Sequence, residues 1–191
     1  MHPIDSSDPR SPRPRPDVTV LRLTAADAER YARLRMRMLR ESPWAFGSSP
    51  ETDVAADRVR LAERMAAPEQ ALFAVEADAG AAPRTLVAAA GLLRATAPKA
   101  AHRARVWGVY VAPEHRRRGL GRAVMEALLH HARGVPGLAW LDLSVSAAAP
   151  AAQRLYADLG FTAWGREADA LRVDGRGHDE IHMALRLVSA E

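Results

Sequence analysis

Cysteine is absent from the 191-residue sequence, which excludes disulfide bonds, thiolate metal sites and a cysteine nucleophile. Long apolar runs are also missing. None approaches the roughly 18 residues that a membrane-spanning helix needs, and no apolar segment of the secretory type follows the first methionine. Apolar residues nevertheless make up 48% of the chain, which is enough for a folded core. The composition predicts a cytoplasmic protein with one ordinary domain and no membrane partner.

The formal net charge of +4 is compatible with nucleic-acid binding, so its distribution along the chain matters. Residues 1–17 hold three arginines and three aspartates and are therefore neutral. Their five prolines predict a disordered tail before a single domain at 18–188. The segment 101–133 carries seven arginines and two glutamates, which accounts for the positive excess. Nucleic-acid binding would need a basic stripe with exposed aromatics, so we expect no nucleic-acid partner.

Hydrophobic periodicity predicts a mixed α/β domain in one piece. Apolar alternation or short apolar runs predict strands at 18–23, 71–77, 85–95, 102–112, 138–145, 161–173 and 178–187. Apolar residues at helical spacing predict helices from Thr24 to about residue 41 and at 53–66, 121–133 and 150–160. The last two strands would form a hairpin across the turn 174–177.

A strand, a short loop and a glycine-rich turn precede the helix at 121–133. The first N–H groups of a helix lack internal partners and favour an anion. Gly119 and Gly121 would let a phosphate approach the bare main chain, and the arginines at 116–118 and 122 would add charge. Ordinary turn chemistry with solvated arginines is the alternative. The phosphate loop of nucleoside triphosphatases and the dinucleotide fingerprint are both missing.

Two segments resemble signature blocks of the GNAT superfamily of acyl-CoA-dependent N-acetyltransferases. Residues 116–121, RRRGLG, match the pattern R/Q-x-x-G-x-G/A, and residues 153–161, QRLYADLGF, match L-Y-x-x-x-G-F. Residues 39–51 also look like one bacterial branch of the family. The resemblance spans 18–187 and implies a single twisted, mostly antiparallel mixed sheet of about seven strands with helices on both faces. It also implies acetyl-CoA as co-substrate and no metal.

The resemblance further implies which residues bind the cofactor. In the family, the strand before the first block splays from its neighbour and frees main-chain groups for the pantetheine amides, here those of Val109 and Val111. The following loop binds the pyrophosphate through backbone N–H groups. The implied cofactor-binding residues are Val109, Tyr110, Val111, Arg116, Arg117, Arg118, Gly119, Leu120, Gly121, Arg122 and Ala123, the last closing the first helical turn.

The resemblance gives Tyr156 the role of protonating the departing CoA thiolate; the alternative is an ordinary packed aromatic. Two positions depart from the family pattern. Ala149 stands where many members have a cofactor-binding asparagine, so that contact is either absent or supplied by Ser144 or Ser146. Residues 104–112 contain no acidic side chain, although many members carry a glutamate base there.

A base could instead come from the last strand. Alternation places His178, Glu180 and His182 on one face of that strand. We expect Glu180 and His182 to take part in catalysis, because carboxylates and imidazoles accept protons near neutral pH. A solvated hairpin face and a set of metal ligands are the alternatives. Trp44, Phe46 and Glu51 are candidates for the acceptor pocket, with simple core packing as the alternative.

The expected function is acetyl transfer from acetyl-CoA to a primary amine of a small molecule or peptide. Direct attack in a ternary complex is expected, because no cysteine is present to form an acyl-enzyme. The alternative is a non-catalytic CoA-binding or regulatory module with the same fold, favoured by Ala149 and by the missing strand glutamate. A polyamine, an aminoglycoside, an amino acid, a drug-like amine and a protein N-terminus all remain open as acceptors. The protein could act as a monomer or a homodimer.

Overall fold

A computed structural model of the protein describes residues 18–77 and 84–187. The predicted tail at 1–17 and the last residue of the predicted domain, Val188, lie outside the described residues. No helix in these two ranges is long and apolar enough to cross a membrane.

Seven strands form one sheet in the order β1-β2-β3-β4-β5-β7-β6. The strands are β1 (Val20–Arg22), β2 (Gln70–Glu76), β3 (Leu86–Arg94), β4 (Arg103–Val111), β5 (Trp140–Ser146), β6 (Thr162–Val173) and β7 (Arg176–Arg186). All neighbouring strands are antiparallel except β4 and β5, which are parallel. The predicted mixed and mostly antiparallel sheet is confirmed.

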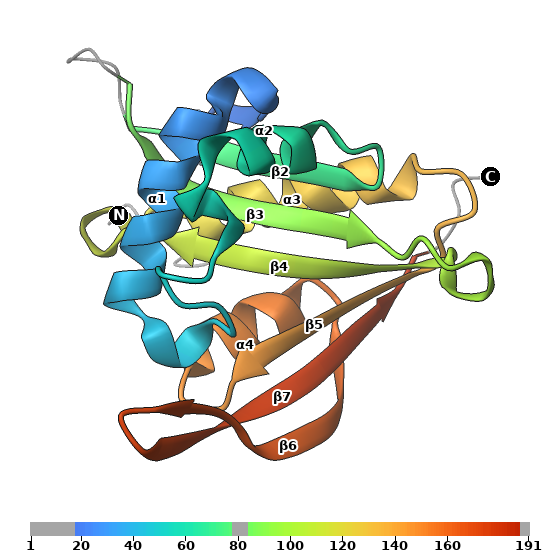
Figure 1. Cartoon of the computed structure of the whole chain (residues 1–191). Helices are drawn as coiled ribbons and strands as arrows, with labels where there is room; N and C mark the ends of the chain where they lie inside the picture. The colour runs from blue at the N-terminus through green and yellow to red at the C-terminus, as the bar shows by residue number, and fades with distance from the viewer. Residues whose placement is uncertain (1–17, 78–83, 188–191) are drawn as a thin grey trace, which may run out of the picture.

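Four helices cover both faces of this sheet, as expected. They are α1 (Ala28–Glu41), α2 (Arg58–Ala66), α3 (Leu120–Arg133) and α4 (Pro150–Asp158). Figure 1 shows α1 and α2 in front of the sheet and α3 and α4 behind it. The apolar stripe of α1 is buried, with Tyr31, Met38 and Leu39 nearly inaccessible to solvent.

The predicted helix at 53–66 is divided in the structure. Residues Val54–Ala56 form a short 3₁₀ turn, and α2 begins only at Arg58. The reason is a second N-cap: the Asp57 carboxylate accepts hydrogen bonds from the N–H groups of Val59 and Arg60. The segment between α1 and α2 therefore contains short 3₁₀ turns and loop instead of a longer α-helix. Several of its residues line the cavity described below.

Two irregularities of β4 position the site. Gly91 of β3 pairs with Trp107, whereas Ala89 pairs with Tyr110, so β4 carries an extra residue at Gly108, whose φ is +61°. On its other side, β4 pairs with β5 only over Arg103–Arg105. Beyond that point the two strands diverge, which Figure 1 shows as a wedge between them with α4 behind it. The sheet is continuous at one end of β4 and open at the other.

Candidate active site

The glycine-rich turn forms a row of free donors. The backbone N–H groups of residues 117–122 have no backbone acceptor within the described parts of the chain, and no side chain caps Gly119. The first helical bond runs from the Ala123 N–H to the Gly119 carbonyl, at 3.0 Å, so Ala123 closes the first turn. Arg117 and Gly119 adopt left-handed φ values of 62° and 78°. Alternating backbone hands of this kind form a concave cradle for an anion.

The arginines around the turn differ in availability. The Arg116 Nε donates to the Val111 carbonyl at 3.0 Å, and Arg122 pairs with Asp158 at 3.0 Å. Arg117 and Arg118 are exposed and have no ion-pair or hydrogen-bond partner among the residues that the structure describes. Sequence reasoning treated all four as equivalent. The structure leaves Arg117 and Arg118 for an incoming anion and uses Arg116 and Arg122 to hold the turn against β4 and α4.

The divergence of β4 from β5 frees main-chain groups of β4. The Ala112 N–H donates to Val87 of β3 at 2.8 Å. Since alternate residues point their N–H and C=O groups to opposite neighbours, Val109 and Val111 direct theirs into the wedge. Tyr110 does not share this geometry, because its main chain pairs with Ala89 and its hydroxyl donates to Glu41. The main chain and the hydroxyl of Tyr110 are therefore both engaged within the protein.

The loop after β4 is anchored to α1. Arg37 forms two hydrogen bonds of 2.7 Å with the carboxylate oxygens of Glu114, and it also pairs with Glu41. The Arg37 guanidinium lowers the pKa of the Glu114 carboxyl to about 2. These contacts fix the chain three residues before the first free donor of the turn.

Leu155, the residue before Tyr156 on α4, lies where α3, α4 and the end of β4 converge. A Cβ on Gly121 would lie 3.4 Å from Leu155 and 3.5 Å from Val111, so helix start, strand end and α4 are in contact at this glycine. Tyr156 is buried edge-on against Phe161, with 6.1 Å between ring centroids. Its hydroxyl has no hydrogen-bond partner among the described residues, and burial raises the pKa of the phenol. Tyr156 therefore carries its proton at neutral pH.

A cavity of about 850 Å³ opens on the face of the sheet that α1 and α2 cover. Gly108 of the bulge, Ser144 of β5 and Glu180 of β7 all line it, so it reaches the point where β4 and β5 part. Phe46 and Glu51, which sequence reasoning proposed for an acceptor pocket, are also lining residues, whereas Trp44 is not. The cavity and the free edge of β4 meet at the bulge.

A buried ion pair organises this cavity. The Arg35 guanidinium donates to Asp53 at 3.0 and 2.7 Å, and both side chains are over 90% buried. Arg35 also lies over the rings of Phe46 and Trp107, at 5.5 and 5.7 Å from their centroids. Burial alone would raise the pKa of the Asp53 carboxyl, but Arg35 and the Ala55 N–H outweigh burial and lower it.

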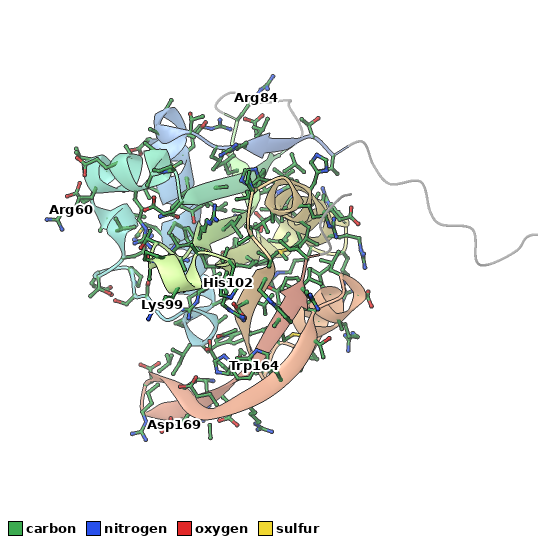
Figure 2. All side chains as sticks on the ribbon, turned by 90° about the vertical axis from the view of Figure 1, so that its right-hand side faces the viewer. Arg60, Arg84, Lys99, His102, Trp164 and Asp169 are labelled. Atoms are coloured by element: carbon green, nitrogen blue, oxygen red, sulfur yellow. The ribbon has the colours of Figure 1, made fainter. Side chains whose placement is uncertain are left out.

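The predicted bases on β7 occupy different positions. Glu180 lines the cavity directly, whereas His182 reaches it through Ser144. The Ser144 hydroxyl and His182 Nδ1 are 3.1 Å apart, and His182 Nε2 lies 2.8 Å from Glu167 on β6. Trp164 stacks on the imidazole with 5.2 Å between centroids and is exposed on β6, as Figure 2 shows.

Sequence reasoning missed Glu167, and it considered Ser144 only as a cofactor contact. Ser146, the other serine considered for that contact, accepts a hydrogen bond from the Ala148 N–H at 3.2 Å. Within the described residues, no group of three His, Asp or Glu side chains is placed to hold a metal ion, and His178 is not a lining residue of the cavity.

Taken together, a mixed sheet that opens beside a glycine-rich helix N-terminus, and a cavity that meets the opening, are the architecture of an acetyltransferase. The model of the acetyltransferase (GNAT) family matches residues 35–161. The chain belongs to this family. A search of curated proteins gave no match.

Solved acetyltransferases share the fold at low sequence identity. A putative acetyltransferase from Salmonella typhimurium, solved with its cofactor acetyl-CoA, has a TM-score of 0.74 and 20% identity over 91% of this chain and 95% of its own. A ribosomal-protein-alanine N-acetyltransferase from Brucella melitensis has a TM-score of 0.73 and 20% identity over 88% of this chain and 99% of its own. A spermidine N-acetyltransferase chimera that includes Vibrio cholerae sequence has a TM-score of 0.70 and 19% identity over 90% of this chain and 96% of its own. The last two proteins are named after different acceptors, an alanine of a ribosomal protein and spermidine. The shared fold therefore does not identify the acceptor of this chain.

Proposed function

We propose that this protein transfers the acetyl group of acetyl-CoA to a primary amine of a small molecule or peptide, by direct attack in a ternary complex. One observation carries the proposal: the cavity reaches the free edge of β4 at the bulge. An amine in the cavity and a thioester along β4 would therefore meet at Gly108. A module that only bound CoA would have no need for a second cavity at this point.

The main chain would hold and polarise the acetyl donor. The N–H and C=O groups of Val109 and the N–H group of Val111 face the wedge and are not paired with β5, whereas the Val111 carbonyl accepts a hydrogen bond from Arg116. These groups would bind the pantetheine amides, and a strand N–H near Val111 would polarise the thioester carbonyl. The donors of 117–122, with Arg117 and Arg118, would bind the pyrophosphate. The amine nitrogen attacks the thioester carbon, so an N–C bond forms as the C–S bond breaks. An ammonium must lose one proton to become a nucleophile and a second proton once the N–C bond has formed, and one proton must reach the sulfur.

Two groups are candidate acceptors for the proton that leaves the amine nitrogen. One is Glu180, and the other is the hydrogen-bonded series Ser144, His182 and Glu167. The Ser144 hydroxyl can take the proton from the amine as it passes its own to His182, and Glu167 would hold the imidazolium that forms. Glu180 lines the same part of the cavity and would attract the ammonium form. For the proton that arrives, Tyr156 is the proposed donor, because it is protonated and its hydroxyl has no other partner in the described chain.

The function is tested by free-thiol release from acetyl-CoA with a panel of primary amines. We expect release that depends on an amine, with initial-rate patterns of a ternary complex. Gly121→Val should lower acetyl-CoA affinity in calorimetry by about tenfold or more, because its side chain would press on Leu155 and Val111 and disturb the donors that bind the pyrophosphate. Gly121→Ala, which adds only the Cβ, is the matched control and should bind nearly normally. Cofactor binding without acetylation of any amine would favour the non-catalytic module.

His182→Ala is expected to lower turnover by about a hundredfold, which is the lower range for a general base, and to alter the acid limb of the pH–rate profile. Binding of acetyl-CoA should not change, because His182 lies outside the wedge that holds it. His178→Ala removes an imidazole from the same strand outside the cavity and serves as the control. An unchanged profile in the His182 variant would assign proton removal to Glu180 or to water, and Glu180→Gln would then separate these two.

A further inference from the structure

The acceptor cavity contains polar atoms that lack partners. Three buried side-chain atoms have no hydrogen-bond partner among the described residues: Tyr31 Oη, Gln70 Oε1 and Trp107 Nε1. All three residues line this one cavity. Tyr31 and Gln70 are only 1% and 7% exposed. Tyr31 Oη lies beside the bulge, 3.6 Å from the position of a Cβ on Gly108, so this hydroxyl belongs to the part of the cavity where the amine would react.

These atoms are fixed in position. The Trp107 indole lies directly over Gly91, where a Cβ would come within 2.5 Å of the ring. Its edge packs against Tyr31, with 6.5 Å between ring centroids. The absence of a side chain at Gly91 thus creates the space in which the indole lies. Trp107 Nε1 lies against Gly91, and the indole forms a fixed wall of the cavity.

The cavity is lined by equal numbers of positively and negatively charged side chains. Its charged lining residues are Arg35, Arg60, Arg64, Arg105, Glu51, Asp53, Asp57 and Glu180. Arg35 pairs with Asp53, and Arg60 pairs with Asp57. A cavity built for a polyamine would carry an acidic excess, which this cavity lacks.

Two lining arginines remain without an acidic partner among the described residues, Arg64 on α2 and Arg105 on β4. Asp142, which lies opposite Arg105 on β5, is bound by Arg103 at 2.9 Å.

The cationic and acidic ends lie on opposite sides of the reaction point. In Figure 1, α2 lies above β4 and β7, which carries Glu180, lies below it. The amine must reach the bulge of β4, close to Ser144 and Glu180. A second group of the same acceptor would extend toward α2, where the guanidinium groups of Arg64 and Arg105 are hydrogen-bond donors.

We propose that Arg64 and Arg105 form a carboxylate subsite on the α2 side of the cavity, and that the acceptor is an amine that also carries a carboxylate. The inference rests on the proposed function, since it names the acceptor class of that same cavity. Charge-assisted hydrogen bonds hold the carboxylate, while the amine at the other end faces Glu180. A diamine would instead place an ammonium group among the arginines.

The test compares acceptors that differ only at the far end. ω-Amino acids of increasing chain length are each assayed against the corresponding amide and the corresponding diamine. At one chain length or more, the acid should have a kcat/KM at least about tenfold above both, as expected for one charge-assisted contact. A dipeptide with an acidic side chain, compared with its amide counterpart, distinguishes a peptide carboxylate from that of a free amino acid. Equal or better activity of the amides or diamines at every length would overturn the proposal.

Two variants locate the subsite. Arg64→Met should remove the preference for the acid, and Arg64→Glu should reverse it toward the diamine. Arg133→Met is the control, since it removes one exposed positive charge from α3 behind the sheet. An acid preference that survives in both Arg64 variants contradicts the assignment.

Calorimetry separates this inference from the proposed function. The ω-amino acids are titrated into protein saturated with CoA, which carries no acetyl group. Binding that Arg64→Met weakens by about tenfold or more supports the subsite even if no amine is acetylated. Acetylation without acid preference and without such binding leaves the function standing and overturns the subsite.

Discussion

An Asp53→Asn variant is expected to lose about 3–5 kcal/mol of unfolding free energy. The substitution keeps the shape of the side chain but leaves the Arg35 guanidinium charged, buried and without its counter-ion. Domains of this size are stable by about 5–15 kcal/mol in total, so the loss is a large fraction. Urea or thermal unfolding measures it directly.

Two further variants test whether the lost stability comes from the unpaired buried charge. Replacing both partners, as in Arg35→Met with Asp53→Leu, should restore much of the stability, because no charge is then left buried. Arg33→Gln breaks an exposed pair with Glu29 on the same helix and should change stability by less than about 1 kcal/mol. An Asp53→Asn protein as stable as the parent would show that the pair is dispensable.

The lowered pKa of Asp53 also fixes the pH dependence. Its contribution is present in full above the ordinary value of 3.8 and is lost as the pH falls through the lower value in the fold. The parent protein should therefore lose stability below about pH 4 more steeply than Asp53→Asn, which has no carboxyl to protonate at this position.

Tyr156→Phe is expected to lower turnover by about tenfold or more, with acetyl-CoA affinity almost unchanged. General-acid catalysis is typically worth about a hundredfold to ten-thousandfold, and water donating in place of the phenol reduces the loss. The hydroxyl has no partner among the described residues, so its removal leaves no protein group unsatisfied. Stopped-time thiol release gives the rate, and calorimetry gives the affinity.

The chain has two other tyrosines, and one of them provides the control. Tyr110→Phe removes a phenol that donates to Glu41, away from the wedge. It should affect stability more than turnover. If Tyr156→Phe turns over at the parent rate, Tyr156 is a packing residue. If its affinity falls together with its rate, the hydroxyl holds the cofactor.

Local patterns predicted the helices and strands well, and they located the glycine-rich turn. The apolar stripe of α1 and the glycines before α3 are properties of consecutive residues, so the sequence alone identifies them. The arginines of the turn were harder, because their availability depends on Val111 and Asp158, which other elements bring close.

The acceptor side depends on register, which no local pattern contains. Glu167 meets His182 only because β6 pairs with β7 across two shifts in register, between Ala163 and Gly165 and between Glu167 and Leu171. The unpartnered atoms of Tyr31, Gln70 and Trp107 come from three separate elements. Their convergence is a property of the packed sheet, so sequence reasoning missed it.

The wedge between β4 and β5 has a thermodynamic consequence for the whole molecule. Within the described residues, β4 and β5 pair only over Arg103–Arg105, next to the hydrogen bonds that the Ala139 and Trp140 N–H groups donate to the His102 carbonyl. A ligand that hydrogen-bonds along the open edge binds the folded chain and not the unfolded one, so its binding free energy adds to the free energy of unfolding. The cohesion between the two halves of the sheet is therefore linked to the concentration of that ligand.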